Sequence, residues 1–527
     1  MNQPMVTYTN PVLPGFYPDP SVIRVGEDYY LAVSSFEYFP GLPIFHSRDL
    51  IHWQQIGHAL HRTTQIDMSS RQSSQGIYAP TIRYHKGTFY LITTDVYGVG
   101  NFYITAENPA GPWSDPIRIP YGNIDPSLMF DEDDKVYVTT QMGADEHSHI
   151  IQYEIDIATG EALTEPVVVA RGDGGVWTEG PHLYKIKGRY YLLCACGGTG
   201  SDHRSLVYRS DNPHGPFEMM PHPMLTHNQL KEHPIQNTGH AELIEDTEGN
   251  WWAMFLAVRP VDGQYSVLGR ESFLAPVTWT EDGWPTVDNN EGTVQFEMNV
   301  PLKSEGTAVS SSGSAAYLSE RQNWEYSGHS SWVEHFDAPF LSLRWTSMRT
   351  LLEDRISLSE RPGALALTGN SNSLRDNAPV VFLGARQQHH SMSVETVIEF
   401  APVQEGEEAG LAIRLNEQSH AQIGVQYRAG KRVVMAAAVD RGEYRLLAEH
   451  EIAASEHKLR ITSDARSYRL MAELITGEWS ILAEVPAISL SPERNGGFTG
   501  VLAGVYATGN GQDCVTTAYV DYFKYDI

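Results

Sequence analysis

The chain has 527 residues, of which 41% are hydrophobic and 10% aromatic, a composition that excludes disordered and fibrous classes and allows two or three domains with full cores. Its formal net charge of −28 argues against a nucleic-acid or anionic-membrane partner, because phosphate groups bind to clustered cationic surfaces. No apolar run approaches the roughly 18 residues of a membrane span, and the first ten residues lack the basic start and apolar core of a signal peptide. We therefore expect a cytoplasmic protein.

A strand pattern recurs five times in the first part of the chain. Each copy has an opening strand of about five residues, a short polar turn, and a second strand that begins with an aromatic pair. The second member of that pair follows the opening residue by 11 or 12 residues in every copy. Repeats of several short strands are typical of propeller blades, so the pattern predicts a five-bladed β-propeller over residues 1–303. The copies open at Asp19, Ala79, Asp125, Glu179 and His240.

The composition changes after the fifth copy. Residues 304–329 are rich in Ser, Gly and Ala, and we expect them to form a linker. From about residue 330, alternating strands such as GLAIRLNE and AQIGVQYRAG are broken by Gly, Asn and Asp turns, which is typical of a β-sandwich. We expect residues 330–527 to form a jelly-roll or concanavalin-like sandwich that packs on the propeller, so the whole chain is predicted to be all-β.

Three of the five repeats open with an acidic residue, and these three residues predict a catalytic site. The first strand of each blade lines the central channel of a propeller, so Asp19, Asp125 and Glu179 should face one another. Hydrolysis of a glycosidic bond needs an acid at the leaving oxygen and a base or nucleophile on the opposite face of the sugar. Asp19 lies between Pro18 and Pro20, which restrain the backbone and suit a fixed base, whereas the longer side chain of Glu179 suits the acid. Asp125 would raise the pKa of Glu179 by like-charge repulsion.

Other residues near the repeat openings are candidates for binding. His240 could orient a carboxylate, hold a water or bind an ion such as calcium on the propeller axis, although a buried core histidine is the alternative. Arg270 could pair with Asp19 and keep it ionised. Phe36 and Tyr78 could stack on the apolar face of a sugar. The chemistry requires no cofactor, and calcium near His240 is the one ion that the sequence suggests.

Two interpretations compete with hydrolysis by an exo-acting enzyme. The Asp-Pro-Ser segments could be simple strand starts, because Asp and Ser favour turns, and the chain would then be a non-catalytic carbohydrate-binding propeller. That class of protein has no need for three carboxylates at a channel mouth. An endo-acting arabinanase or xylanase is the second competitor, and it would require an open groove rather than a pocket.

Six segments in chain order carry a resemblance to a known family: NPVLPGFYPDPSVI, GIYAPTI, NIDPSLMF, WTEGPHLY, NTGHAEL and LGRES. They resemble glycoside hydrolase family 43, in particular its two-domain β-xylosidases and α-L-arabinofuranosidases. The resemblance implies hydrolysis with inversion, in which Asp19 matches the base, Asp125 the pKa modulator and Glu179 the acid. His240 and Arg270 match the family's pocket histidine and arginine.

The resemblance also bears on the substrate. Tyr78 stands where many relatives carry Trp, and Ile124 stands where β-xylosidase relatives often carry an aromatic residue, so the preferred pentose is left open. The segment RNGGFTG around Phe498 is similar to a sandwich loop that closes the pocket in two-domain relatives. The resemblance thus implies removal of terminal β-1,4-xylosyl units from xylo-oligosaccharides or arabinoxylo-oligosaccharides, with α-L-arabinofuranosidase as an additional or even the main activity. A homodimer or homotetramer is expected.

Overall fold

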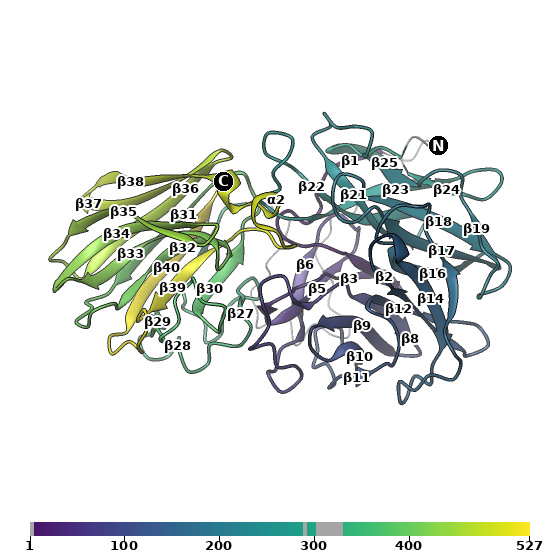
Figure 1. Cartoon of the computed structure of the whole chain (residues 1–527), viewed down its shortest axis with the longest axis horizontal. Coiled ribbons are helices and arrows are strands. Elements are labelled where there is room, and N and C mark those ends of the chain that lie inside the picture. The colour runs from purple at the N-terminus through teal and green to yellow at the C-terminus, as the bar shows by residue number, and fades with distance from the viewer. Residues whose placement is uncertain (1–4, 288–291, 302–329) are drawn as a thin grey trace.

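The computed structural model describes residues 5–287, 292–301 and 330–527, which form two β-rich bodies side by side (Figure 1). The N-terminal body is drawn in purple to teal and the C-terminal body in green to yellow. The helical elements are short segments: η1 (Asp145–His147), η2 (Ala487–Leu490) and α2 (Pro492–Asn495). The predicted all-β class is therefore confirmed. The predicted linker, 304–329, lies outside the described residues.

The N-terminal body contains five antiparallel sheets that follow one another along the chain, one for each repeat of the sequence. The first sheet has β2 (Ser21–Val25), β3 (Asp28–Ala32), β5 (Gly41–Ser47) and β6 (Gln54–Leu60); the second has β7 (Gly76–Ile77), β8 (Thr81–His85), β9 (Thr88–Val96), β10 (Gly100–Ala106) and β11 (Ile117–Arg118); the third has β12 (Ile124–Phe130), β13 (Val136–Met142), β14 (His149–Glu154) and β15 (Val167–Ala170).

The remaining two sheets have the same antiparallel order. The fourth has β16 (Glu179–Ile186), β17 (Arg189–Cys196), β18 (Arg204–Ser210), β19 (Glu218–Met219) and β20 (Leu225–Thr226); the fifth has β21 (Gln236–Glu245), β22 (Trp251–Val258), β23 (Glu271–Trp279) and β24 (Pro285–Val287). In addition, β1 (Met5–Thr9) pairs with β25 (Glu297–Pro301), so the start and the end of this body are joined.

The opening strands of the five sheets lie next to one another in a closed circuit. β2 contacts β8, β8 contacts β12, β12 contacts β16, β16 contacts β21, and β21 returns to β2. This arrangement is that of a β-propeller, in which the sheets surround a central axis and leave only short edges exposed.

A buried network of hydrogen bonds crosses the propeller axis. The carboxylate of Glu242 accepts hydrogen bonds from Ser21 Oγ at 2.7 Å and from Arg83 Nη1 at 3.2 Å. His182 Nδ1 lies 3.0 Å from the same carboxylate, and Arg83 Nε donates to the carbonyl oxygen of Leu128 at 3.2 Å. Each of the five sheets contributes one of these residues, so the network fixes the opening strands relative to one another.

The C-terminal body is a sandwich of two antiparallel sheets with an apolar core between them that includes the fully buried Leu411, Ile423 and Ile461. One sheet contains β26 (Trp332–Glu334), β28 (Ile356–Ser357), β29 (Leu365–Leu367), β40 (Ala518–Asp526), β31 (Ser391–Glu399), β36 (Glu456–Asp464), β37 (Ser467–Ile475) and β38 (Glu478–Pro486); the other contains β30 (Val381–Arg386), β39 (Leu502–Thr508), β32 (Glu408–Asn416), β33 (Ser419–Arg428), β34 (Lys431–Asp440) and β35 (Glu443–Glu451).

The two bodies are joined by backbone contacts. β4 (Tyr38–Phe39) of the propeller pairs with β27 (Ser347–Met348) of the sandwich side. Close to the C-terminal end of α2, Val501 N donates to Val267 O at 3.1 Å, and Gly500 lies against Leu268. A Cβ atom on Gly500 would lie 2.3 Å from Leu268 O, so only glycine allows this approach. These contacts fix the sandwich loop that contains Phe498 over the propeller.

We predict that Gly500→Ala lowers the free energy of unfolding by about 1 to 3 kcal/mol, because the added methyl group must displace the backbone at Leu268. The apparent midpoint of thermal unfolding should fall accordingly. Gly200→Ala is the matched control, since neither glycine has a positive φ and a Cβ atom on Gly200 meets no heavy atom within 4 Å. Equal midpoints for the two variants would contradict the role given to this contact.

Candidate active site

One cavity of about 670 Å³ at the mouth of the propeller contains the side chains that the sequence singled out. Eight of them come from the propeller, and the ninth comes from the sandwich loop that follows α2. The structure therefore brings together every predicted site residue. They are Asp19, Phe36, Tyr78, Ile124, Asp125, Glu179, His240, Arg270 and Phe498.

The backbone at the repeat openings has an unusual conformation. Asp19, Asp125 and His240 have φ angles of 55°, 52° and 53°. These values lie in the left-handed region, which residues other than glycine rarely adopt and which costs free energy. The repetition of one rare conformation at equivalent places in three sheets indicates that the fold enforces it. Its effect is to turn these side chains into the cavity.

Bulges in the opening strands have the same effect. In each of β12, β16 and β21, a step of three residues along the strand is paired with a step of only two residues along the neighbouring strand. These bulges lie at Asp125 in β12, just after Glu179 in β16, and at His240 in β21. A bulge bends the strand and re-aims a side chain. Gly180, within the second of these bulges, has a φ of +54°, and a Cβ atom there would lie 2.8 Å from His240 Nε2. Glycine at this position thus allows the imidazole to lie directly over the backbone.

Asp19 has an opposite charge beside it. Arg270 Nη1 donates to Asp19 Oδ1 at 2.8 Å, Ser34 Oγ donates to Oδ2, and His240 Nδ1 lies 3.6 Å from Oδ1. Asp19 is only 5% exposed. A buried carboxylate needs a compensating cation and hydrogen-bond donors, and this set of neighbours supplies both. The ion pair between Arg270 and Asp19 that the sequence predicts is present.

Glu179 and Asp125 lie in a different environment. Burial raises the pKa of Glu179 well above its usual value, the charges of Asp125 and Asp19 raise it further, and Arg270 opposes them. Burial also raises the pKa of Asp125 to about 6, against the influence of His240 and of the Gly180 N–H group, which donates to Asp125 Oδ2 at 3.0 Å. The repulsion expected from the sequence therefore acts on Glu179, but burial is the larger cause.

Three aromatic rings form one wall of the cavity. The ring centroid of Phe36 lies 5.0 Å from that of Tyr78 and 6.0 Å from that of Phe498. Ser74 joins the two bodies at this wall, because its Oγ accepts a hydrogen bond from Phe498 N and its carbonyl oxygen accepts one from Tyr78 OH, both at 2.9 Å. Phe36 is almost completely buried, whereas Phe498 is 38% exposed, so Phe498 offers the more open apolar face. Arg270 Cζ lies 5.6 Å from the ring centroid of Phe36.

The sequence did not single out several residues that shape the cavity. Trp177 lines it with a φ of 51°, and Thr199 Oγ1 accepts a hydrogen bond from Arg270 Nη1 at 3.3 Å. Trp177 belongs to the WTEG segment and could have been found from its place before Glu179. Thr199 and Ser34 lie outside the repeat pattern, so no signal in the sequence marked them.

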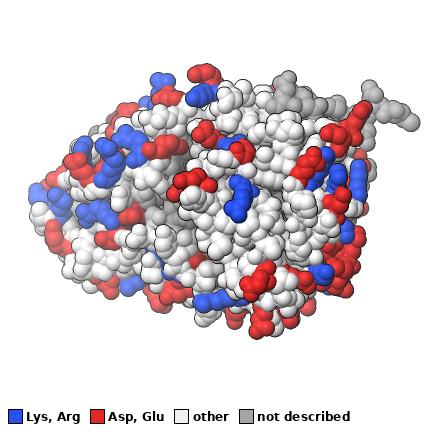
Figure 2. All heavy atoms as spheres, turned by 45° about the vertical axis from the view of Figure 1, so that its right-hand side comes forward, with Lys and Arg blue, Asp and Glu red and all other residues white. Residues whose placement is uncertain are grey.

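No group of three or more His, Cys, Asp or Glu side chains could hold a metal ion within residues 5–287, 292–301 and 330–527. The ion predicted near His240 stays a prediction. Across the same ranges, no helix has the length and apolarity needed to span a membrane. On the face drawn in Figure 2, basic side chains lie among acidic ones and form no continuous basic field of the kind that binds nucleic acid.

Comparisons with known proteins give matches over both bodies. The family model of the glycosyl hydrolases family 43 matches residues 8–285, and that of the beta xylosidase C-terminal concanavalin A-like domain matches residues 333–526. These matches confirm the predicted order of a propeller followed by a concanavalin-like sandwich.

Similar proteins span the whole chain. The non-reducing end alpha-L-arabinofuranosidase BoGH43B of Bacteroides ovatus is 39% identical over 98% of this chain and 94% of its own length. A xylosidase/arabinosidase of Butyrivibrio fibrisolvens is 37% identical over 99% of both chains. The solved structure of a xylan beta-1,4-xylosidase from Bacillus halodurans C-125 has a TM-score of 0.88 and 33% identity, and the match covers 99% of this chain and 100% of that one.

We predict that Asp125→Asn moves the alkaline limb of the pH profile of kcat/KM for glycoside hydrolysis to lower pH. The charge of Asp125 is the second cause, after burial, of the raised pKa of Glu179, and a general acid is active only while protonated. Because burial is unchanged, the limb should stay above the pH expected for a solvent-exposed glutamate.

The matched control for this change is Asp134→Asn, which removes an exposed carboxylate in the turn between β12 and β13. This control should leave the limb in place. If the limb also stayed in place in Asp125→Asn, the charge of Asp125 would have no influence on the acid.

Proposed function

This chain belongs to glycosyl hydrolases family 43 and is a glycosidase, and we propose that it acts on the non-reducing ends of pentose oligosaccharides. The proposed reaction removes terminal β-1,4-linked D-xylose from xylo-oligosaccharides and arabinoxylo-oligosaccharides, with inversion at the anomeric carbon. Release of terminal α-L-arabinofuranose is proposed as a further activity of the same site.

The observation that carries this proposal is the contrast between two carboxyl groups in one cavity. Asp19 is paired with a guanidinium at 2.8 Å, whereas the pKa of Glu179 is raised well above its usual value. Inverting hydrolysis needs one ionised and one protonated carboxyl group at the same time. The guanidinium beside Asp19 and the raised pKa of Glu179 support these two roles.

In the proposed step, Asp19 accepts a proton from a water molecule while the water oxygen forms a bond to the anomeric carbon. The bond from that carbon to the leaving oxygen breaks, and Glu179 donates its proton to the leaving oxygen. Asp125 accepts a hydrogen bond from the N–H group of Gly180, the residue after Glu179, and so holds the strand that carries the acid. The negative charge of Asp125 also raises the pKa of Glu179.

The contribution of the sandwich supports attack on chain ends. Phe498 reaches the cavity from the sandwich loop and packs against Phe36 and Tyr78, so one wall of the cavity belongs to the second body. Such a wall blocks the continuous groove that an endo-acting enzyme requires. Digestion of polymeric xylan or arabinan is therefore expected to release monosaccharides, and release of longer fragments would favour the endo-acting alternative.

The alternative of a primary α-L-arabinofuranosidase has its own support, because the relative that is 39% identical carries that name. The ratio of kcat/KM for nitrophenyl β-D-xyloside and nitrophenyl α-L-arabinofuranoside decides between the two pentoses. A non-catalytic sugar-binding propeller would turn over neither, and its Asp19→Ala and Glu179→Ala variants would bind sugars as the parent does. A cytoplasmic location, a homo-oligomer and calcium near His240 stay predictions of the sequence.

We predict that Glu179→Gln lowers kcat/KM on xylobiose by roughly 10² to 10⁴, the contribution expected of a general acid. The loss should be much smaller for a dinitrophenyl pentoside, because that leaving group departs without a proton. Steady-state kinetics on the two substrates checks the difference. Glu165→Gln, a change of the same kind at an exposed position, serves as control. Equal losses on both substrates would show that Glu179 is not the acid.

A further inference from the structure

The sandwich loop that carries Phe498 is tied to the propeller on both sides of that residue. Before it in the chain, the carboxylate of Glu493 in α2 accepts hydrogen bonds from Ser266 N at 3.0 Å and from Ser266 Oγ at 2.5 Å. After it, Val501 N donates to Val267 O at 3.1 Å. These ties fix the two ends of the loop, but they do not by themselves fix the ring of Phe498.

Two glycines lead directly into Phe498. Gly496 and Gly497 are exposed and have φ angles of 73° and 88°. Glycine has the greatest backbone freedom of all residues, so this part of the loop leaves the position of the next residue weakly determined. A Cβ atom on Gly497 would lie 2.5 Å from Ser74 Oγ, so glycine also leaves room for that hydroxyl group. The ring of Phe498 therefore needs contacts of its own to stay in the cavity wall.

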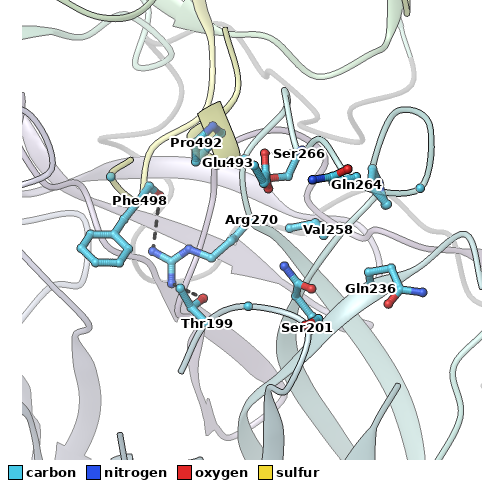
Figure 3. A pocket seen from close by; sticks show the side chains of 16 residues that line it. Thr199, Ser201, Gln236, Val258, Gln264, Ser266, Arg270, Pro492, Glu493 and Phe498 are labelled. Atoms are coloured by element: carbon cyan, nitrogen blue, oxygen red, sulfur yellow. Dashed lines mark hydrogen bonds between the residues drawn. The ribbon is translucent and has the colours of Figure 1, made fainter. Parts of the chain in front are cut away.

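Propeller side chains hold both polar atoms of the Phe498 backbone. Ser74 Oγ accepts a hydrogen bond from Phe498 N at 2.9 Å. On the other side, Arg270 Nη2 donates to Phe498 O at 3.4 Å, as Figure 3 shows. The second contact is long, and the same guanidinium is already paired with Asp19. The bond to Ser74 is thus the better of the two, and we call it the Phe498 latch.

The backbone of Ser74 is itself held in place. Ser74 is buried and has a φ of 65°, a value that residues other than glycine rarely adopt. Its N–H group donates to Glu37 Oε2 at 2.8 Å, and its carbonyl oxygen accepts a hydrogen bond from Tyr78 OH at 2.9 Å. The hydroxyl and the carbonyl group of one serine therefore position two of the three aromatic rings of the cavity wall, and Glu37 fixes the serine.

Glu37 is a fully buried carboxyl group among buried cations. Burial raises its pKa, and the guanidinium groups of Arg349 and Arg414 oppose that shift. Arg414 lies 3.6 Å from a carboxylate oxygen of Glu417, and its nitrogens make no hydrogen bond within the part of the chain that the structure describes. Buried cations need negative charge nearby, which Glu37 supplies. The surroundings of Glu37 thus fix the acceptor to which Ser74 N donates.

We propose that Ser74 and Glu37 are positioning residues of the glycosidase: Ser74 latches Phe498 over the bound sugar, and Glu37 holds Ser74 in the conformation that the latch requires. Neither residue is among those that line the cavity, so both act through the aromatic wall. The effect on the sugar rests on the proposed function, whereas the latch is a contact between the two bodies that exists with or without turnover.

Ser74→Gly is the variant that tests the latch most cleanly. It removes the hydroxyl group but keeps the N–H and carbonyl groups, and glycine adopts the φ of 65° without strain, so the variant should fold. The matched control is Ser73→Gly. Ser73 Oγ donates to Glu417 Oε2 at 2.5 Å, so this neighbour also joins the propeller to the sandwich, but it does so away from Phe498.

Two changes at Glu37 separate its hydrogen bond from its charge. Glu37→Ala removes the acceptor for Ser74 N, whereas the amide oxygen of Glu37→Gln can still accept that bond. Both variants remove the negative charge beside the buried guanidinium groups, so both should unfold at a lower temperature than the parent. Only Glu37→Ala should disturb the latch. If Glu37→Ala does not fold, Ser74→Gly still tests the proposal.

The first arm of the experiment measures amide hydrogen exchange by mass spectrometry in peptides that cover residues 494–500. The N–H group of Phe498 should exchange at least severalfold faster in Ser74→Gly than in the parent, because its acceptor is gone, and Ser73→Gly should behave as the parent does. Unchanged exchange in Ser74→Gly would overturn the latch. This arm needs no substrate, so its failure is distinct from failure of the proposed function.

The second arm measures steady-state kinetics on xylobiose. Ser74→Gly and Glu37→Ala should raise KM by about threefold to tenfold, as loss of one hydrogen bond predicts, while kcat changes by less than about twofold. The pH profile of kcat should not move, since Asp19 and Glu179 keep their surroundings. Ser73→Gly and Glu37→Gln should retain the KM of the parent. A purely structural role would lower the unfolding temperature in Ser74→Gly and leave KM unchanged, which would contradict the proposal.

A double variant shows whether Ser74 acts through the aromatic ring. Phe498→Ala removes the ring that the latch positions, so Ser74→Gly should raise KM no further when it is added to Phe498→Ala. Independent, multiplying effects of the two changes would overturn the positioning role, because Ser74 would then influence the sugar by another route.

Discussion

The guanidinium of Arg270 is the group on which the site depends most. It neutralises the buried carboxylate of Asp19 at 2.8 Å, lies under the rings of Phe36 and Phe498, and reaches the backbone of the sandwich loop at Phe498 O. Without this cation the buried carboxylate of Asp19 would lose the guanidinium that compensates for its burial. One side chain thus joins the electrostatics of the reaction to the closure of the pocket by the second body.

The geometry of the carboxylates is held by the centre of the propeller. Asp19, Asp125 and His240 have left-handed backbone conformations, and bulges interrupt three of the opening strands. Such conformations persist only where the surrounding structure compensates for their cost. The buried network around Glu242, to which every sheet contributes, lies within the same strands and supplies that compensation.

The periodic part of this structure could be predicted from the sequence. The five repeats each form one sheet, and equivalent positions such as Asp19 and Glu179 meet because their strands surround one axis. Contacts made by irregular segments could not be predicted. The pairing of β4 with β27 and the hydrogen bond of Thr199 arise where segments of distant sequence meet. Ser34, which binds Asp19, lies just beyond the first repeat, so no repeat marks it. The dominance of burial over repulsion at Glu179 also depends on packing that the sequence pattern does not specify.

The central claim is that Asp19 and Glu179 act as base and acid on opposite faces of one sugar, so that water attacks the anomeric carbon directly. Proton NMR during the first moments of hydrolysis of a β-xyloside observes the first-formed anomer of xylose before mutarotation. The account predicts α-xylose first, with β-xylose growing in later. Initial release of β-xylose would require a covalent intermediate and would contradict the roles assigned to the two carboxyl groups.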